Sequence, residues 1–388
     1  MPEKRNLQTQ GRPGCAACGL TAAYPFAAID KNGECKYCRG FVRRSAKGKE
    51  GLLKDLALQP GERIGVNVSG GKDSIYMLGV LQELLGAERI LVLTYYRPGI
   101  TSEIALDNVR RTAEILGTEL LVYTDGEAYA RFRRNFELLL ENPRAEAVRV
   151  LLCAGCRYGI TAQLYAEGQK HHVRKYISAA SYLELAPFKE ELLEALSPRG
   201  DGEDGLERLI REYPALDHGD TLEVIRRDHH YKYKNNETLR GQLPVSPDIR
   251  LFDFDDYFEN DPERIEKTVV QKFGWRKTDR SWHFDCIIED IKDVFYYGLL
   301  GYTEMDFKAA AMVRYGLLTL DRAQEIVALH NRKIADSYAQ MAERLRQHRL
   351  AHMLPQLDSF YQSSPYLVFP EAGNGSRDKG MKTEGSGG

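Results

Sequence analysis

Ser69-Gly70-Gly71-Lys72-Asp73-Ser74 is the stretch that decides the fold of this chain. It follows a β-branched apolar run, residues 64–68, and precedes a helical pattern, residues 75–85, so that a strand, a tight turn and a helix are predicted. Glycines let the backbone turn sharply and expose successive N–H groups, and a helix start carries a partial positive charge. This arrangement favours a phosphate site in which Lys72 adds a full charge and Asp73 holds Mg²⁺. The alternative is a glycine-rich turn without a ligand.

The segments around this stretch alternate between strand and helix patterns. We expect strands at 62–68, 89–95, 119–124 and 174–180, and helices at 74–86, 101–116, 127–141 and 156–169. Strands separated by helices predict βαβ units, and hence an α/β fold with a doubly wound, mostly parallel sheet. Because such sheets bind ligands beyond the carboxyl ends of their strands, we expect adenine and ribose near Thr94–Tyr96.

Composition excludes few classes of function. The 388 residues carry a net charge of −2 and are 43% hydrophobic and 28% charged, which is ordinary for a globular protein of two or three domains. No global charge favours nucleic acid or an anionic membrane. No run approaches the roughly 18 apolar residues of a membrane span, and residues 1–12 are polar and lack a signal-peptide pattern. We therefore expect a cytoplasmic protein without membrane partners.

Four cysteines near the N-terminus form two Cys-x-x-Cys pairs, Cys15 with Cys18 and Cys35 with Cys38. Their spacing predicts a four-cysteine zinc ribbon over residues 13–45, after a disordered segment at 1–12. Two disulfides or free thiols are the alternatives. We expect a structural Zn²⁺, with a basic linker leading from the ribbon to the main domain.

The glycine stretch differs from a kinase-type P-loop, because position 71 is Gly and Asp73 follows the lysine. It resembles the PP-loop of the N-type ATP pyrophosphatase superfamily. The resemblance implies a PP-loop domain at 58–250 that binds ATP and Mg²⁺ through Ser69, Gly70, Gly71, Lys72, Asp73 and Ser74, with Lys72 and Asp73 catalytic. It also implies that ATP is cleaved between its α- and β-phosphates, that a carbonyl oxygen is adenylated, and that a nucleophile displaces AMP.

Further motifs resemble the bacterial N-acetyl sugar amidotransferases within this superfamily. An Asn32-Gly33 turn precedes the second cysteine pair, and a helical C-terminal region expected at 251–355 carries four short motifs in order. These motifs are Gly274-Trp275, Asp285-Cys286, Gly301-Tyr302-Thr303 and Arg314-Tyr315-Gly316-Leu317-Leu318-Thr319. The resemblance implies that ammonia attacks an adenylated acetamido group of a nucleotide sugar, in the biosynthesis of surface polysaccharide sugars. Since no cysteine has a glutaminase-like setting, a separate glutaminase subunit is implied.

A third Cys-x-x-Cys pair, Cys153 and Cys156, leaves three interpretations open: a metal or cluster site, a redox or sulfur-carrying pair, or a structural pair at a helix start. Several tRNA thiolation enzymes of the superfamily resemble this chain here, and there three cysteines hold a 4Fe-4S cluster. The third cysteine would be Cys286, at a longer offset than in those enzymes. The alternative function is thus thiolation of tRNA or another carbonyl, with a sulfur donor protein. A third hypothesis is a non-enzymatic zinc-ribbon adaptor with a degenerate ATP fold.

Two polar segments complete the candidate sites. Residues 196–248 have a loop-like pattern that predicts an insertion or lid, whose basic and aromatic residues either grip phosphates and bases or form a solvated loop. These residues are Arg226, Arg227, His229, His230, Tyr231, Lys232, Tyr233, Lys234 and Arg240. The acidic trio Asp253, Asp255 and Asp256 is interpreted as a helix N-terminal cap in preference to a metal site.

The C-terminal part predicts helices at 261–273, 287–300, 304–316 and 319–350, and a disordered tail at 371–388. The last helix has a narrow apolar seam, formed by Val327, Ile334, Tyr338, Met341 and Leu345. We expect this seam to pack on its own domain, with a second subunit in a homo-oligomer as the alternative.

Overall fold

Five parallel strands form the sheet of this computed structural model, in the order β3-β2-β1-β4-β5. The structure describes residues 14–179, 181–184, 186–196, 204–216, 218–233, 249–277 and 285–370. The strands are β1 (Ile64–Asn67), β2 (Ile90–Tyr96), β3 (Glu119–Thr124), β4 (Lys175–Ser178) and β5 (Arg250–Asp253). The predicted α/β class and four predicted strands are confirmed, and β5 is an additional edge strand. The strand order reverses beside β1, which pairs with β2 on one side and β4 on the other.

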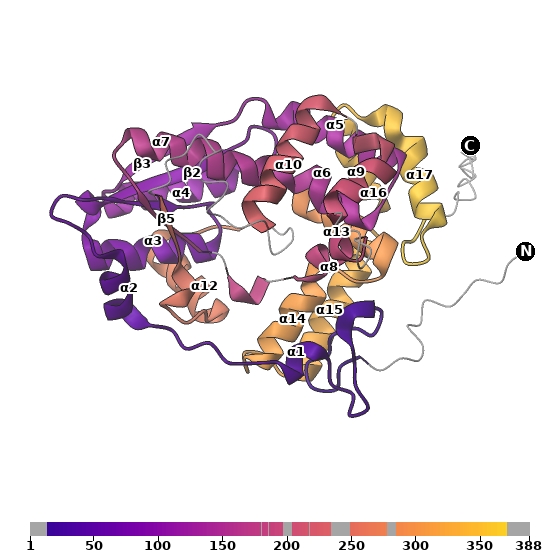
Figure 1. The fold of residues 1–388 in the computed structure, drawn as a ribbon, viewed down its shortest axis with the longest axis horizontal. Coiled ribbons are helices and arrows are strands. Elements are labelled where there is room, and N and C mark those ends of the chain that lie inside the picture. Colours follow the sequence, from indigo (N-terminus) through magenta and orange to yellow (C-terminus); the bar gives the residue numbers. More distant parts are fainter. Residues whose placement is uncertain are drawn as a thin grey trace, which may run out of the picture.

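Helices cover both faces of this sheet (Figure 1). Side chains alternate along β2, so that Ile90 and Val92 enter one core while Leu91 and Leu93 enter another. The first core is closed by α2 (Gly48–Leu56), α3 (Lys72–Leu85), α4 (Glu103–Leu116) and α12 (Pro262–Phe273). The second is closed by a π-helical segment (Gly159–Leu164) and α7 (Tyr165–Lys170).

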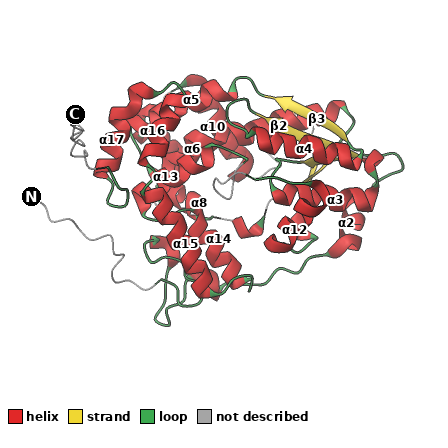
Figure 2. Ribbon diagram, turned by 180° about the vertical axis from the view of Figure 1, so that it is seen from behind, coloured by secondary structure: helices red, strands yellow, loops and turns green. Residues whose placement is uncertain are grey.

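The remaining helices form a lobe beside the sheet, with α6 (Ala145–Tyr158) at its centre (Figure 2). Its direct neighbours are α5 (Ala128–Glu141), α8 (Phe188–Glu194), α10 (Gly219–Tyr233) and α13 (Ile288–Leu300). The lobe also contains α9 (Gly205–Glu212), α14 (Glu304–Arg314), α15 (Leu320–Ala335), α16 (Tyr338–Gln347) and α17 (Leu354–Ser363). Short helical turns are η1 (Pro25–Ala27), α1 (Lys36–Arg39), η2 (Ala87–Arg89), η4 (Tyr182–Glu184), η5 (Pro214–Leu216), η6 (Phe254–Asp256) and η7 (Ala351–Met353).

Three expected elements differ from the structure. The helix expected at 156–169 begins earlier, because α6, the π-helical segment and α7 form one continuous helical run. The loop-like pattern of 196–248 contains α9 and α10, so that the loop prediction is wrong for its described part. The helix expected at 319–350 is broken between α15 and α16, where the Ser337 hydroxyl donates to the Ile334 carbonyl oxygen, 2.6 Å away.

The seam of the last helices packs within this chain. Ile334, Met341 and Leu345 are buried in the core that α5, α6 and α13 also line, as expected for these positions, whereas Val327 is half-buried and lies outside that core. The expected disordered ends, 1–12 and 371–388, lie outside the described residues. In the described residues no helix is both long and apolar enough to cross a membrane.

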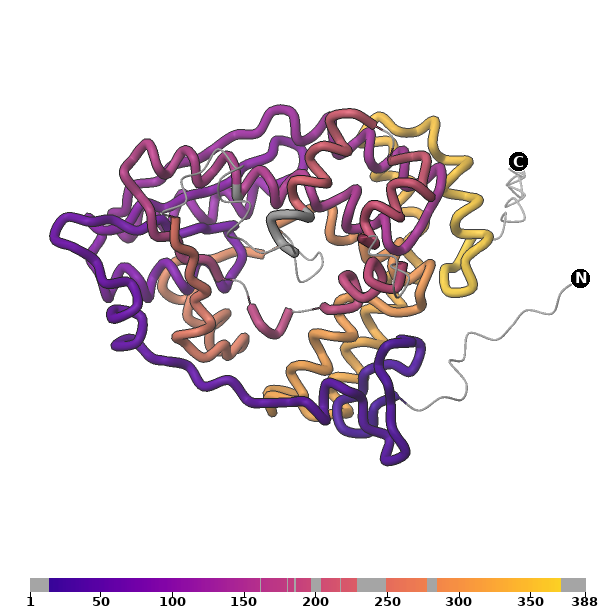
Figure 3. The backbone as a smooth tube through the Cα atoms, in the orientation of Figure 1, coloured from indigo at the N-terminus to yellow at the C-terminus, as the bar shows by residue number. Residues whose placement is uncertain are grey.

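The N-terminal segment links the helical lobe to the sheet (Figure 3). After α1, the Phe41 ring packs edge-on against Tyr315, with centroids 4.9 Å apart. The chain then reaches the turn after β5, where the N–H groups of Lys47 and Gly48 donate to the carbonyl oxygens of Asp256 and Tyr257, each at 3.0 Å. The linker is thus hydrogen-bonded to the carboxyl end of the sheet before α2 begins.

Candidate functional site

The glycine stretch lies between β1 and α3, at the carboxyl end of the sheet and beside the point where the strand order reverses. Two serines brace the turn. The N–H of Ser69 donates to Ser74 Oγ at 3.2 Å, and the Ser74 hydroxyl donates to the Gly71 carbonyl oxygen at 2.9 Å. The six predicted residues therefore form a tight turn and the start of α3, and they are called the phosphate loop below after the ligand predicted for them.

Gly70 is the residue of this loop that only glycine can fill. Its φ is +88°, and a Cβ there would lie 2.1 Å from the carbonyl oxygen of Ala105 in α4. The Gly70 carbonyl oxygen accepts a hydrogen bond from Trp275 Nε1 at 3.0 Å and a longer one, 3.4 Å, from Asn108 Nδ2. The loop is consequently held from α4 and from the segment after α12. Trp275 was expected as part of a family motif, but not as a contact of the phosphate loop.

The Lys72 side chain faces an open hollow beside α12. Lys72 Nζ lies 2.6 Å from Asp73 Oδ1, and their side chains are 20% and 23% exposed. The hollow is lined by Lys72 and by residues of α12, which are Pro262, Glu263, Glu266, Lys267, Val270 and Gln271. The N-cap residue of α3, Gly71, has no side chain to cap the N–H groups of the first turn. A helix N-terminus with a neighbouring lysine is suited to bind an anion.

The acidic trio does not cap the following helix, so that this interpretation is wrong. The N-cap of α12 is Asp261, whose carboxylate accepts from the N–H of Arg264 at 3.1 Å. Asp253 instead ends β5, and Asp255 and Asp256 lie in the short helical turn η6 that follows it. Asp253 Oδ1 accepts from the Ser178 hydroxyl at 3.1 Å. Burial, followed by repulsion from Asp73, raises the pKa of Asp255 to about 6.

The residues expected near adenine and ribose lie at the end of β2, next to the phosphate loop. The Thr94 hydroxyl donates to the Val68 carbonyl oxygen at 2.9 Å. The Tyr95 hydroxyl donates to Asp125, and burial with this contact raises the pKa of Tyr95. The Tyr96 hydroxyl donates to Glu103 at 2.6 Å. The hydroxyl groups of Thr94 and Tyr95 are thus hydrogen-bonded to other parts of the protein. A contact between residues 94–96 and a nucleoside stays a prediction.

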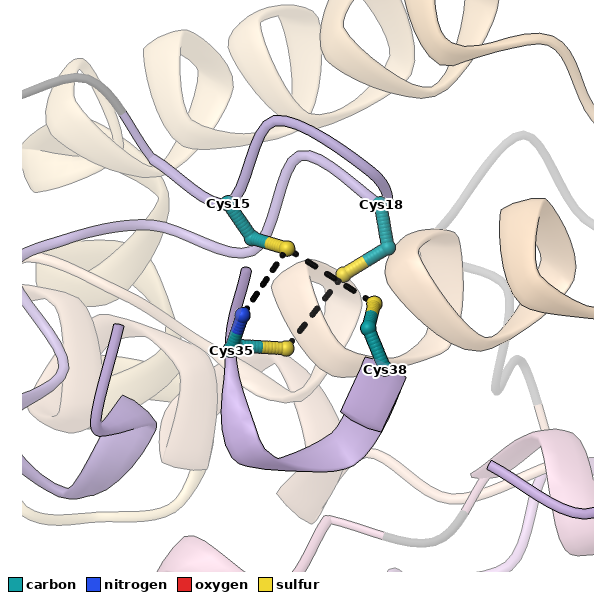
Figure 4. A group of neighbouring side chains, drawn as sticks. All are labelled: Cys15, Cys18, Cys35 and Cys38. Atoms are coloured by element: carbon teal, nitrogen blue, oxygen red, sulfur yellow. Dashed lines mark hydrogen bonds between the residues drawn. The ribbon is translucent and has the colours of Figure 1, made fainter. Parts of the chain in front are cut away.

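The four N-terminal cysteines form one cluster, as Figure 4 shows. Their sulfur atoms all lie within 4.8 Å of one another. Cys15 and Cys38 are 3.6 Å apart, and Cys18 and Cys35 are 3.8 Å apart. Tetrahedral Zn²⁺ with Zn–S bonds of about 2.3 Å would set sulfur–sulfur distances of about 3.8 Å, so this cluster has the donor atoms and spacing of a four-thiolate metal site.

Two cysteine sulfur atoms of the cluster accept hydrogen bonds from neighbouring groups. The N–H of Cys35 donates to Cys15 Sγ at 3.3 Å, and Arg314 Nη1 donates to Cys18 Sγ at 3.4 Å. The hydrogen bond between Cys18 and Cys35 lowers the pKa of the Cys35 thiol to about 4 and raises the pKa of the Cys18 thiol. The cysteines are free, and three of them are buried. We conclude that residues 13–45 contain a group that can hold a metal ion such as zinc.

The cysteine module packs on the helical lobe. The Tyr24 ring contacts Tyr302 and Phe307 edge-on, with centroids 5.5 and 4.9 Å away. Lys36 Nζ donates to Glu191 Oε1 of α8 at 2.5 Å. The module lies on the helices rather than at the carboxyl end of the sheet (Figure 1). This position favours a structural role for the metal.

The C-terminal motifs behind the family resemblance occupy defined structural positions. Trp275 contacts the phosphate loop and Arg314 contacts the cysteine cluster. Thr303 and Thr319 are the N-caps of α14 and α15 and accept hydrogen bonds from the backbone of the first turn. The Gly274-Trp275 and Arg314–Thr319 motifs therefore touch the candidate sites, whereas Thr303 and Thr319 serve the fold as helix caps.

The third cysteine pair lies at the end of α6, not at a helix start as expected. Burial raises the pKa of Cys153, and it raises the pKa of Cys286 to about 12. The Arg97 side chain forms a hydrogen bond with Cys156. Burial lowers the pKa of Arg97, but the neighbouring Cys156 and Cys286 raise it by more, so that its pKa is above the usual value. Cys286 is held beside the end of β2 by a bridge to Thr101. The structure thus places Cys156 and Cys286 around one arginine.

These three cysteines differ in spacing from the N-terminal cluster. Among the described residues, they are not a group whose ligand atoms approach closely enough to share a single ion. Whether they carry an iron–sulfur cluster or sulfur stays a prediction.

The described part of the basic segment is engaged in contacts within the lobe. Arg226 pairs with Glu207 at 3.0 Å, and Arg227 pairs with Glu223 at 2.6 Å and donates to the Tyr158 hydroxyl at 3.0 Å. The other predicted residues of this segment lie outside the described part of the structure. This applies to the side chains of His229, His230, Tyr231, Lys232 and Tyr233 and to the whole of Lys234 and Arg240.

Comparison with known proteins adds no identification, since neither the family models nor the curated proteins searched match this chain.

Proposed function

We propose that this protein is a PP-loop ATP pyrophosphatase that adenylates an amide oxygen for attack by ammonia, in the manner of an N-acetyl sugar amidotransferase. The observation that carries the proposal is the phosphate loop. It joins the central strand β1 to α3 where ligands bind in doubly wound sheets, and Gly70 has a conformation and a close contact that exclude a side chain. ATP is the substrate that this loop suits best.

The residues of the loop act on the phosphates by position and charge. The first-turn N–H groups of α3 and the Lys72 ammonium bind the β- and γ-phosphates, and binding draws Lys72 away from Asp73. Asp73 would then hold Mg²⁺, which would supply further neutralisation of phosphate charge. Stabilising the departing pyrophosphate lowers the barrier to its release.

The proposed reaction has two steps, adenylation of the amide oxygen and displacement of AMP by ammonia. The acceptor amide oxygen attacks the α-phosphorus, its new P–O bond forms while the bond to the β-phosphate oxygen breaks, and pyrophosphate leaves. Ammonia then attacks the activated carbon, the C–O bond to AMP breaks, and a proton is released, which leaves an acetamidino group. The family resemblance implies a glutaminase partner that supplies the ammonia, and four of the seven cysteines lie together in the metal cluster.

The test is labelled pyrophosphate exchange into ATP with acetamido nucleotide sugars as acceptors. Acceptor-dependent exchange, with AMP and pyrophosphate as products, supports the proposal. Release of ADP and phosphate contradicts it. Absence of both exchange and ATP binding favours the adaptor hypothesis.

A second candidate function is thiolation of a tRNA or another carbonyl, favoured by the arrangement of Cys156 and Cys286 around Arg97. Burial raises the pKa of Cys286 to about 12 and so opposes its thiolate form, which means that this candidate rests on the position of the two cysteines beside the Arg97 guanidinium. Iron and sulfide analysis of protein prepared without air distinguishes the two functions. About one zinc and no iron per chain favours the amidotransferase, and a 4Fe-4S cluster favours thiolation.

A further inference from the structure

Asp255 is a buried carboxylate whose contacts in the described residues are all neutral. It is 7% exposed. Its Oδ2 accepts from Asn260 Nδ2 at 3.2 Å, and it also accepts hydrogen bonds from the Ser181 hydroxyl and the Tyr182 N–H. The neighbouring Asp256, by contrast, is paired with Arg44. Because buried charges in proteins are usually paired or bind metals, the environment of Asp255 is incomplete without a cation.

The charge that acts on Asp255 most directly is a second carboxylate, Asp73 of the phosphate loop. The two residues follow β5 and β1, and Ser181 follows β4, which lies between those strands. Three neighbouring strand ends therefore bring two carboxylates to one edge of the sheet. Asp73 is already paired with the Lys72 ammonium, 2.6 Å away, so Asp255 is the one of the two carboxylates that has no cationic partner among the described residues.

Asn260 provides an independent indication of such a cation. This residue is 5% exposed, and its Nδ2 donates to both Asp255 and the Ser181 hydroxyl, at 3.2 and 3.1 Å. Its amide oxygen is on the same planar group, is buried, and accepts no hydrogen bond from any described residue. An unsatisfied buried oxygen beside a carboxylate lacks a donor or a metal ion.

We propose that Asp73, Asp255 and the amide oxygen of Asn260 form a divalent-cation site at the carboxyl ends of β1, β4 and β5. All three supply oxygen atoms, the ligands that Mg²⁺ and Mn²⁺ prefer. The interpretation of the cation as one that bridges to ATP rests on the proposed function. With ATP bound, Asp255 holds the metal from the β4–β5 side of β1, whereas β2 lies on the other side of β1. The metal then fixes the phosphates relative to the acceptor.

The test is Mn²⁺ titration of the full-length, zinc-loaded protein without nucleotide, with free Mn²⁺ measured by electron paramagnetic resonance. The Cys cluster does not interfere, because thiolates select zinc over manganese. The variants are Asp255→Asn and Asp73→Asn, which preserve shape. The matched control is Asp256→Asn, which removes the adjacent, more exposed carboxylate. Circular dichroism and thermal unfolding establish that each variant is folded.

We expect the wild-type protein and Asp256→Asn to bind one Mn²⁺ with similar affinity. We expect the Mn²⁺ affinity of Asp255→Asn and of Asp73→Asn to be lower by a factor of about ten or more. Equal Mn²⁺ affinity of a folded Asp255→Asn variant and the wild type overturns the inference, and so does a wild-type protein that binds no Mn²⁺. The pyrophosphate exchange assay is read separately. A site that binds Mn²⁺ through Asp255 in a protein that never forms AMP supports this inference and refutes the proposed function.

Discussion

The indole N–H of Trp275 donates a hydrogen bond to the carbonyl oxygen of Gly70 across 3.0 Å. This contact joins the segment after α12 to the phosphate loop, and Asn108 binds both the Gly70 carbonyl oxygen and the carbonyl oxygen of Arg276, at 3.4 and 2.7 Å. The turn of the loop is therefore positioned by residues distant in the sequence. Its geometry depends on the packing of α12 against α3.

Replacing Trp275 with Phe removes this hydrogen bond and keeps an aromatic ring in the core. We expect a loss of about 1 kcal/mol in the free energy of unfolding, together with weaker ATP binding because the loop is less well held. Urea unfolding and equilibrium dialysis measure the two effects. The control is Tyr257→Phe, which removes a hydrogen bond to Asp55 elsewhere in the same core and should change stability alone. Unchanged ATP affinity in Trp275→Phe contradicts the positioning role.

Gly70 and Gly71 make a matched pair. Gly70→Ala places a Cβ 2.1 Å from the Ala105 carbonyl oxygen at a φ of +88°, and we expect a loss of about 2 kcal/mol or more in the free energy of unfolding. Gly71→Ala meets nothing closer than Ser69 Oγ at 3.4 Å, and its stability should stay near that of the wild type. Denaturant titration of both variants is the measurement. A Gly70→Ala variant as stable as Gly71→Ala would show that the loop has another conformation.

Lys72→Ala tests the charge of the loop. The side chain contacts Asp73 and the open hollow, so we expect the variant to fold normally and to lose pyrophosphate exchange. Lys49→Ala, on the exposed surface of α2, removes the same charge without touching the loop and should retain activity. Full exchange by folded Lys72→Ala would remove this lysine from the mechanism.

Cys15→Ser tests the metal cluster. With three thiolates left, we expect the zinc content to fall from about one per chain and the N-terminal module to become sensitive to protease. Atomic absorption and limited proteolysis measure these changes. The comparison is Cys153→Ser, outside the cluster, which should retain the zinc. Unchanged zinc in Cys15→Ser would place the metal elsewhere.

We expect His348 to make the free energy of unfolding depend on pH. It is buried between Tyr129 and Phe132, with Nδ1 2.9 Å from the Tyr129 hydroxyl, and burial followed by repulsion from Arg344 lowers its pKa. Below the usual histidine pKa of about 6.5 the unfolded chain takes up a proton that the folded chain resists, so stability falls as the pH falls through this range.

We therefore expect His348→Gln, which stays neutral, to lose less stability than the wild type between about pH 6.5 and the lowered pKa of the folded state. Thermal unfolding across this range is the measurement. His352→Gln, at an exposed position beside Glu137, should follow the wild-type curve. Parallel curves for His348→Gln and the wild type would contradict the assigned role of His348.

The local features of the site were predictable, because a strand, a glycine turn and a helix start are encoded by neighbouring residues. The cysteine cluster was also predictable, since the spacing within each pair sets its geometry. The contact between Trp275 and Gly70 was not, because 205 residues separate its partners and no local pattern connects them. The same reason hides the electrostatic effect of Asp73 on Asp255, which depends on the order of the strands.

Two errors of secondary structure have physical causes. Helix α6 is surrounded by α5, α10 and α13, so that Val148, Val150, Leu151 and Leu152 are all buried and the one-sided apolar pattern of a surface helix is lost. Strand β5 is short and lies at the sheet edge with Leu251 44% exposed, which removes the alternation that marks a strand. Burial on all sides and exposure at an edge both weaken the sequence signal.

The linker after the cysteine module has a consequence for shortened versions of this protein. Because the N–H groups of Lys47 and Gly48 bind the carbonyl oxygens of Asp256 and Tyr257, a chain trimmed to begin within α2 loses two backbone hydrogen bonds at the turn after β5. Removing the metal-binding end would thus disturb the opposite side of the molecule as well. A cut placed ahead of Arg44 keeps this connection, together with the ion pair that Arg44 forms with Asp256.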